Sequence, residues 1–318
     1  MNYNEVVLPV LAAFGVTAVC TGFLAPWLRN RKIKQTERVE GVQSHLKKAG
    51  TPTMGGIAIL IGLLVVSLIW MRSNPNIIPV MILTFGFGAI GFLDDFLKVG
   101  LRRSDGLIAW QKLLLELVVA AVFLWYLTRV SGLSLDMLVP FTSGTKSVSL
   151  GVLSVPFAII VILATVNGVN FTDGLDGLAS SVTIVTALFF GLSSMILSGG
   201  ITPIAFGVVG ALMGFLLFNA YPAKIFMGDT GSLALGGFVA GAAYVMQEPL
   251  YIPIVGFIYA FELLSVAMQV TYFKLTHGKR IFKMTPIHHH FELCGWSETK
   301  IVAIFTIITA LLSLAALA

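Results

Sequence analysis

The apolar segments of this chain constrain its fold more than any other feature. A helix that crosses the hydrocarbon core of a bilayer needs about 20 predominantly apolar residues, and segments of this kind recur along the whole sequence. Inside lipid the backbone N–H and C=O groups have to be hydrogen-bonded within the segment, so each segment is expected to be helical. We predict one all-α integral membrane domain over residues 1–318, with about ten spans at 6–28, 54–71, 77–97, 107–130, 152–169, 181–198, 201–219, 232–247, 251–275 and 301–318.

Composition supports the membrane class. The chain is 57% hydrophobic and 11% charged, whereas soluble domains carry about 25% charged residues. The first apolar segment has neither a basic stretch before it nor a small-residue cleavage site after it, so we interpret it as a retained span rather than a signal peptide. Cys20 lies in a span and Cys294 in a polar loop, so no disulfide is expected. The net charge of +5 is better explained by topology than by nucleic-acid binding.

The distribution of lysine and arginine predicts the orientation. Seventeen of the 20 lie in, or at the membrane edge of, the loops on one side, and the opposite loops hold only Arg72, Arg129 and Lys146. Loops rich in Lys and Arg stay in the cytoplasm. An even number of spans then leaves both termini outside the cytoplasm. The outer loop 131–151 mixes turn residues with short β-prone runs, which is typical of a small hairpin.

Two adjacent acids end the third predicted span on the cytoplasmic side. Neighbouring side chains on a helix point about 100° apart, so Asp94 and Asp95 cannot serve one point identically. One could face a metal or substrate while the other accepts a hydrogen bond from a lysine or the backbone. The simpler alternative is an acidic pair that only marks the membrane boundary. Acids beside apolar sequence are costly unless they are used, which favours function.

The segment 170–177 combines an amide, a hydroxyl, two carboxylates and glycines. Asn170, Asp173 and Asp176 recur every third residue, which keeps them on one flank if the stretch is helical. Gly177 permits the backbone to turn and approach a ligand. Asn, Asp and Gly are also ordinary turn residues. The absence of Lys and Arg from this segment, on an otherwise basic side, favours function over a plain turn.

The motif Gly-Asp-Thr-Gly-Ser at 228–232 opens the eighth predicted span. A carboxylate beside free backbone N–H groups at a helix start suits a hydrated Mg²⁺ and a phosphate together. Oxygen ligands without a nearby cysteine favour Mg²⁺ or Mn²⁺ over zinc, so Asp229 is a candidate metal ligand. The alternative is an N-cap, for which Asp, Thr and Ser are all preferred.

Basic and intramembrane residues complete the candidate set. The run of three histidines at 288–290 is not expected to bind one zinc ion, because consecutive side chains splay apart; anion binding, or a mixture of structural and substrate contacts, is favoured. Lys47 or Lys48, and Lys112, could neutralise phosphates. Acids within spans are functional candidates by default, here Glu116 and Glu262, although hydrogen bonding between helices explains Glu116 equally well.

Together these groups indicate phosphoryl transfer, which depends on positioning and on charge neutralisation through Mg²⁺. At a membrane face this chemistry suggests one soluble phosphate-bearing substrate and one lipid-borne acceptor. An alternative of another class is a secondary transporter. Transporters place binding groups near the bilayer midplane, often in repeated halves, whereas here the polar groups gather at span ends and no repeat is visible.

Five stretches carry a family resemblance that spans essentially the whole chain. They are Gly-Thr-Pro-Thr-Met-Gly-Gly at 50–56, the Asp94-Asp95 pair, 170–177, 226–232 and Pro-Ile-His-His-His-Phe-Glu-Leu at 286–293. In this order they resemble the polyprenyl-phosphate N-acetylhexosamine-1-phosphate transferase superfamily and, within it, the phospho-N-acetylmuramoyl-pentapeptide transferase (translocase I) family. The last stretch is characteristic of the muramoyl branch and argues against a relative that uses a UDP-N-acetylglucosamine-type donor.

The resemblance implies a Mg²⁺-dependent enzyme of peptidoglycan synthesis. Undecaprenyl phosphate would attack the β-phosphate of UDP-N-acetylmuramoyl-pentapeptide and give lipid I and UMP. The site would face the cytoplasm, in the bacterial cytoplasmic membrane. The family also implies ten spans, a ninth helix that is broken or bent, a lipid groove beside it, and a homodimer.

The resemblance also implies roles for individual residues. Asp229 would bind Mg²⁺, Asp94 and Asp95 would handle the lipid phosphate, and His289 would join them in catalysis. A covalent attack by an Asp and a single displacement use the same residues, and the single displacement needs fewer steps. Lys48 is preferred to Lys47 because it lies two residues before Gly50. The residues expected to line the substrate site are Lys48, Lys112, Asn170, Asp173, Asp176, Gly177, Asn219, Phe226 (against uracil), Ser232, Gln269, His288 and His290.

Overall fold

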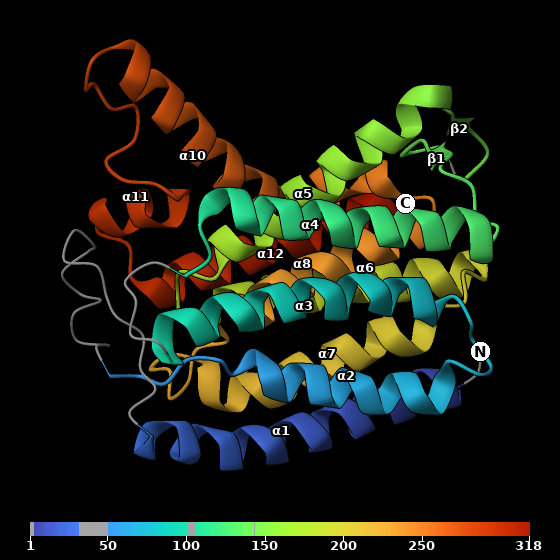
Figure 1. Cartoon of the computed structure of the whole chain (residues 1–318), viewed down its shortest axis with the longest axis horizontal. Coiled ribbons are helices and arrows are strands. Elements are labelled where there is room, and N and C mark those ends of the chain that lie inside the picture. Colours follow the sequence, from blue (N-terminus) through green and yellow to red (C-terminus); the bar gives the residue numbers. More distant parts are fainter. Residues whose placement is uncertain (1–2, 32–49, 101–105, 143) are drawn as a thin grey trace.

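Nearly all of the chain is helical in the computed structural model, which describes residues 3–31, 50–100, 106–142 and 144–318. Figure 1 shows long helices running side by side along one direction, with α10 and α11 projecting at one end and two short strands at the other. The main helices are α1 (Val7–Asn30), α2 (Gly56–Trp70), α3 (Ile77–Gly100), α4 (Ala109–Trp125), α5 (Ser154–Thr172), α6 (Leu178–Leu197), α7 (Thr202–Asn219), α8 (Gly228–Val245), α9 (Ile252–Val255), α10 (Phe257–Leu275), α11 (Ile287–Leu293) and α12 (Glu298–Leu317).

Seven helices among the described residues are long and apolar enough to cross a membrane, or eight if the bent pair α9–α10 is one span. Short helical turns extend several of the main helices or join them: η1 (Tyr3–Glu5), η3 (Tyr126–Val130), η4 (Gly151–Leu153) and η5 (Pro249–Tyr251). The other two of our ten predicted spans correspond to α2, which has 15 residues, and to α8. The chain is therefore a mostly helical, multi-pass membrane protein, and the count of ten stays a prediction.

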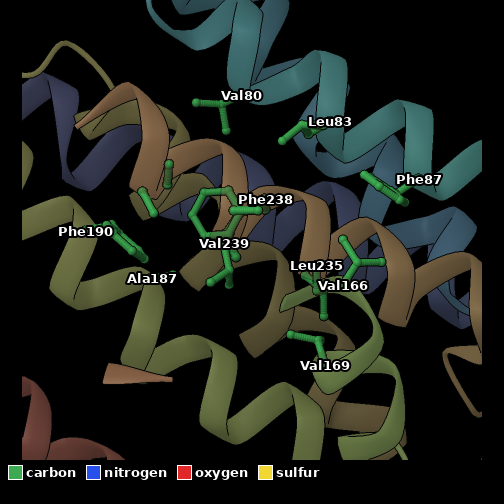
Figure 2. Close-up of a cluster of buried hydrophobic side chains, with 14 of the residues drawn as sticks. Val80, Leu83, Phe87, Val166, Val169, Ala187, Phe190, Leu235, Phe238 and Val239 are labelled. Carbon is green, nitrogen blue, oxygen red and sulfur yellow. The ribbon is translucent and has the colours of Figure 1, made fainter. Parts of the chain in front are cut away.

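Helix α8 lies at the centre of the packing. All of its residues from Thr230 to Val245 are buried, so its surface meets protein on every side. In Figure 2, Phe238 and Leu235 of α8 lie among Leu83 and Phe87 of α3 and apolar side chains of α5 and α6. This burial explains why α8 tolerates a polar first turn, which a lipid-facing span would not.

Close backbone approach brings α8 against its neighbours. A Cβ atom on Gly237 would lie 2.5 Å from the carbonyl oxygen of Leu83 on α3, and one on Gly236 would lie 2.5 Å from Cα of Val166 on α5. Small residues allow helices in membranes to pack at such short range. The acidic end of α3 and the start of α8 are held in contact as a result.

The predicted ninth span is broken. Residues 249–255 and α10 meet at an angle of 83°, and Gly256 stands at the break between α9 and α10. The bend implied for this segment by the family resemblance is confirmed. Beyond the break, α10 leaves the bundle and carries α11 back toward the ends of α3 and α5 (Figure 1).

The loop after α4 contains two short strands, β1 (Met137–Leu138) and β2 (Ser147–Val148), which pair antiparallel. The backbone N–H of Leu138 donates to the carbonyl of Gln247 at 2.7 Å, and Nε2 of Gln247 donates to Oγ of Ser134 at 2.6 Å. These bonds attach the strand pair to the end of α8, opposite the end that carries the acidic motifs.

Candidate active site

The start of α8 is fixed by a carboxylate from α3. Asp95 is buried and accepts hydrogen bonds from the backbone N–H groups of Asp229 (3.1 Å) and Thr230 (2.9 Å) and from Oγ1 of Thr230 (2.6 Å). The first N–H groups of a helix have no partner within it, and a negative charge there is stabilised by the helix dipole. Both oxygens of Asp95 are used in this way, so Asp95 orients the turn that carries Asp229.

Asp94, the neighbour of Asp95, points elsewhere, as adjacent helical positions require. Its Oδ1 accepts the backbone N–H of Leu107 at 2.7 Å, and its Oδ2 forms an ion pair with Lys98, one helical turn further along α3. Asp94 is buried. The two acids therefore have different partners, and both have donors.

Asp229 is the point at which four helices converge. Its Oδ2 lies 2.9 Å from Nζ of Lys98 on α3 and 3.6 Å from Nζ of Lys112 on α4. Its Oδ1 accepts from Nδ2 of Asn170, in the last turn of α5, at 2.9 Å. The same amide nitrogen lies 2.8 Å from Oγ of Ser232. The predicted residues Asp94, Asp95, Lys112, Asn170, Asp229 and Ser232 thus share one cluster.

Lys98 is a member of this cluster that sequence reasoning missed. It joins the carboxylates of Asp94 and Asp229, and its side chain is 41% exposed. In the sequence it stands among many lysines of the basic loops. The available signal was its position four residues after Asp94, a spacing at which opposite charges meet on a helix.

The loop after α5 adds another carboxylate. Helix α5 ends at Thr172, so the condition for a common helical flank of Asn170, Asp173 and Asp176 is not met: the chain leaves the helix between the first residue and the other two. Although Asp173 as a whole residue is half-buried, burial raises the pKa of its carboxyl well above the usual range, and the nearby charge of Asp229 adds to this. Asp173 therefore adds a further carboxyl group near Asp229.

Three predicted substrate residues support a second loop. Asp176 accepts the backbone N–H of Ala223 at 2.9 Å. Asn219 donates to the carbonyl of Ile225 at 3.1 Å and accepts from Oγ of Ser180 at 3.1 Å. Gly177 precedes α6 in a left-handed conformation with φ of 77°. These contacts shape the segment 220–225 that leads into α8.

The motif at 50–56 forms backbone hydrogen bonds with Phe226, which directly follows that segment. The backbone N–H of Phe226 donates to the carbonyl of Pro52 at 2.9 Å, and the N–H of Gly55 donates to the carbonyl of Phe226 at 2.9 Å. The Phe226 residue is half-buried, so part of its surface faces solvent. Lys47 and Lys48 lie outside the described residues.

The three histidines have three different environments, as expected for consecutive residues. His288 is buried with Nδ1 3.1 Å from Oε1 of Glu262. Nδ1 of His289 lies 2.7 Å from Oε2 of Glu292. His290 accepts the backbone N–H of Lys283 at Nδ1, 3.1 Å away. The arrangement does not make a single metal site.

Gln269 and Glu116 are both held by partners between elements. Oε1 of Gln269 accepts the backbone N–H groups of Ile281 and Phe282, each at 3.0 Å, so this amide shapes the segment before α11. Oε2 of Glu116 accepts from Nδ2 of Asn167 on α5 at 3.2 Å. The hydrogen bond between helices that the sequence offered for Glu116 is present.

The donor atoms of the cluster fit a magnesium ion. Among the described residues no group of three His, Cys, Asp or Glu side chains is arranged as a complete metal site. Mg²⁺ does not require one, because it is usually bound through one or two carboxylates together with water and substrate phosphates. The oxygens of Asp229, the crowded carboxyl of Asp173 and the absence of thiolates from the cluster match these preferences.

The fold and the site define a class, the membrane-embedded transferases: the family model of glycosyl transferase family 4 matches residues 77–247. Signature 1 of phospho-N-acetylmuramoyl-pentapeptide-transferase matches residues 48–60. A protein of that name from Acetivibrio thermocellus is 48% identical, over 98% of this chain and 94% of the relative. One from Clostridioides difficile is 45% identical, over 98% of this chain and 97% of the relative.

The chain therefore belongs to the phospho-N-acetylmuramoyl-pentapeptide-transferase family, and it is a phosphotransferase enzyme of peptidoglycan synthesis. The resemblance stated from the five sequence stretches is confirmed. The transporter alternative finds no support in these relatives.

Proposed function

We propose that this enzyme transfers phospho-N-acetylmuramoyl-pentapeptide from its UDP-linked donor to undecaprenyl phosphate, giving lipid I and UMP. The names of the relatives support this reaction. The observation that carries it is the convergence of two lysines, an amide and several carboxylates on Asp229, at one end of a membrane-embedded bundle. A diphosphate needs cationic partners, and a lipid acceptor needs a site at a membrane surface.

In the proposed reaction an oxygen of the lipid phosphate attacks the β-phosphorus of the donor. The bond between that phosphorus and the oxygen bridging to the α-phosphate breaks, and UMP leaves with the electron pair. We favour this single displacement over a covalent aspartyl intermediate. Among the four acids on the cluster, Asp95 has both oxygens committed to the N-terminus of α8, which makes it a poor nucleophile.

The lysines have a defined part in this proposal. Lys98 and Lys112 neutralise Asp229 in the absence of substrate. Phosphate oxygens of the donor would compete for the same ammonium groups, since phosphate and carboxylate are both hard anions. Both lysines then stay where negative charge develops on the leaving UMP, without further movement of the helices that carry them.

Magnesium is part of the proposal. Asp229 would hold it, and Asp94, which shares the ammonium group of Lys98 with Asp229, is an adjacent carboxyl group. When bound, Mg²⁺ would neutralise charge on the diphosphate and stabilise the leaving group. The chain's own contribution is to fix the Asp229 carboxylate through Asn170 and through the cap that Asp95 places on α8.

Topology and assembly extend the proposal. We infer ten spans, both termini outside the cytoplasm, and the carboxylate cluster facing the cytoplasm from the bacterial inner membrane, because Lys98 and Lys112 lie at the cluster's end of the bundle and positively charged residues favour the cytoplasmic side. The strand pair β1–β2 would then lie on the outer surface. A homodimer and a lipid groove beside the bent ninth span follow from the family resemblance.

The reaction is tested with purified protein in detergent, by measuring exchange of labelled UMP and formation of the lipid product. Activity should require the muramoyl-pentapeptide donor and polyprenyl phosphate. UDP-N-acetylglucosamine offered in place of that donor tests the related superfamily activity and should give no product. Product from UDP-N-acetylglucosamine alone would overturn the assignment of the donor.

A further inference from the structure

A buried acid and a buried histidine face each other beside the site, and their pairing has not yet been explained. Glu262 on α10 is 0% exposed and His288 on α11 is 1% exposed, and Nδ1 of the imidazole lies 3.1 Å from Oε1 of the carboxylate. The backbone N–H of His288 makes a longer contact of 3.5 Å to Oε2. A carboxylate this deeply buried is destabilising unless hydrogen-bonded or paired, so the pairing sets where the imidazole sits.

The pairing also sets the tautomer. A carboxylate only accepts hydrogen bonds, so the ring nitrogen facing it carries the proton. His288 therefore has N–H at Nδ1 and, in its neutral form, a lone pair at Nε2. Nε2 is buried and has no hydrogen-bond partner in the described part of the chain. A buried polar atom of this kind is uncommon in folded proteins and calls for an explanation.

The orphan nitrogen is directed at the acidic loop. A Cβ atom built on Gly174 would lie 2.2 Å from Nε2 and 2.5 Å from Cε1 of His288. Glycine at position 174 is what allows the ring to approach the loop between Asp173 and Asp176. The loop follows directly from the last turn of α5, where Asn170 holds Asp229. His288 thus places α11 against the loop that follows Asn170.

Helix α10 presents a polar face that holds the whole segment in place. Gln269, two turns beyond Glu262, binds the backbone of Ile281 and Phe282, while Glu262 binds His288. The two side chains are seven residues apart and so lie on the same face of the helix. A purely packing role would not need a carboxylate at the more buried of the two positions.

We propose that Glu262 is a positioning residue for the donor site: it fixes the Nδ1–H tautomer of His288 and presents the Nε2 lone pair at Gly174 as an acceptor for an N–H or O–H group of the nucleotide-sugar. The inference rests on the proposed function. The hydroxyl and amide groups of a nucleotide-sugar supply such donors, and binding one satisfies the orphan nitrogen.

The tautomer is tested first on the unmodified protein. Histidine labelled with ¹⁵N, in protein reconstituted in lipid nanodiscs, should show a His288 signal with protonated Nδ1 and unprotonated Nε2, assigned by its loss in His288→Gln. A neutral ring protonated at Nε2 would overturn the inference, and this measurement needs no variant of Glu262.

Kinetics test the role in donor binding. Glu262→Leu should raise KM for the UDP-linked donor roughly tenfold, the size expected for one misplaced hydrogen bond, with kcat and KM for the lipid acceptor changed less than about threefold. Glu262→Gln, whose amide oxygen still accepts from Nδ1–H, should retain the tautomer and most of the donor affinity.

The matched control is Ser265→Ala, a buried change one turn along α10 that removes a hydroxyl bonded to the carbonyl of Glu262. It should behave like the unmodified enzyme. Equal loss in Ser265→Ala and Glu262→Leu, or an unchanged donor KM in Glu262→Leu, would overturn the positioning role. If the unmodified protein did not transfer muramoyl-pentapeptide, the proposed function would be contradicted. The tautomer of His288 would still be decided, because its measurement does not depend on activity.

Discussion

The two ends of the helical bundle both bury acidic side chains, but they treat them differently. At the end where α8 starts, Asp229 lies within 4 Å of two lysines, with Nζ distances of 2.9 and 3.6 Å. At the end where α8 finishes, buried Glu248 has a hydroxyl partner, Ser193, and its Oε2 has no hydrogen-bond partner among the described residues. Burial raises the pKa of Glu248 to about 7, although the Ser193 bond lowers it.

The difference separates a charged site from a neutral one. A carboxylate with ammonium and amide donors stays ionised and can exchange those partners for a substrate or an ion. A carboxyl with only a hydroxyl partner is stabilised best in its protonated form. The first end is therefore suited to transferring an anionic group, and the acid at the second end to packing in its neutral form.

Removing the charge at the first end should have the largest effect. Asp229→Ala should lower UMP exchange by about 1,000-fold, because the variant loses the carboxylate on which the lysines and the amide converge. Yield and melting temperature in detergent should stay near those of the unmodified protein. Asp136→Asn, in the loop that carries β1, is the control and should retain activity; an active Asp229→Ala would remove the metal assignment.

Removal of divalent cations should have the second largest effect on activity. Chelation with EDTA should reduce lipid product formation by roughly 100-fold, since crowded carboxylates and a diphosphate would no longer share a bound cation. Added Mg²⁺ should restore activity. Melting temperature measured alongside should change little, which separates loss of chemistry from loss of fold, and full activity after chelation would contradict the proposed magnesium dependence.

Lys98, the cationic residue of the cluster that only the structure revealed, should have the third largest effect. Lys98→Met should reduce kcat roughly 30-fold, because a charge-assisted bond to the diphosphate is lost and Asp94 keeps a buried charge without its ion pair. Lys274→Met, at the exposed end of α10, is the matched control. Similar activity in both variants would show that Lys98 only contributes to the basic character of that surface.

Glu248 should have the smallest effect on activity and a visible effect on stability. Because its pKa is raised from 4.5 to about 7 in the folded protein, the folded state holds a proton that the unfolded state has lost between these pH values. Stability contributed by this group is therefore highest at low pH and falls as pH rises toward 7 and above.

Glu248→Gln keeps a neutral group at this position and should remove that dependence. Its melting temperature should exceed that of the unmodified protein by a few degrees at pH 8, and the two should converge near pH 4.5. Transfer activity should remain within about twofold. A larger loss of activity in Glu248→Gln than in Lys98→Met would contradict the division between the two ends.

Much of the site was predictable because its residues end apolar segments. Asp94, Asp95, Asn170 and Asp229 each stand where a predicted span stops or starts, and helices of similar length bring such positions to the same level. The sequence did not reveal that Asp95 caps α8, because the cap joins Asp95 to Asp229 and Thr230, which lie 134 and 135 positions further along the chain. The sequence also gave no sign that Lys98 differs from the other lysines of the basic loops.

The roles of other predicted residues depended on packing. Asn219 and Gln269 were expected at the substrate, and both bind backbone groups of neighbouring loops. An amide side chain can bind either a substrate or a backbone group, so the residue type alone does not distinguish these two roles. The sequence left open whether the segment 170–177 is helix or turn, and the structure ends α5 at Thr172 and turns the loop toward His288.

The sequence by itself determined the membrane class, the helical fold and the positions of the polar groups at helix ends, because hydrophobic length and charge are properties of short segments. Only the tertiary structure decided which carboxylate meets which cation and that Nε2 of His288 faces Gly174. Lys98 and Asp229 are 131 residues apart in the chain. Their pairing depends on α3 packing against the buried helix α8, where glycines allow the two backbones to approach.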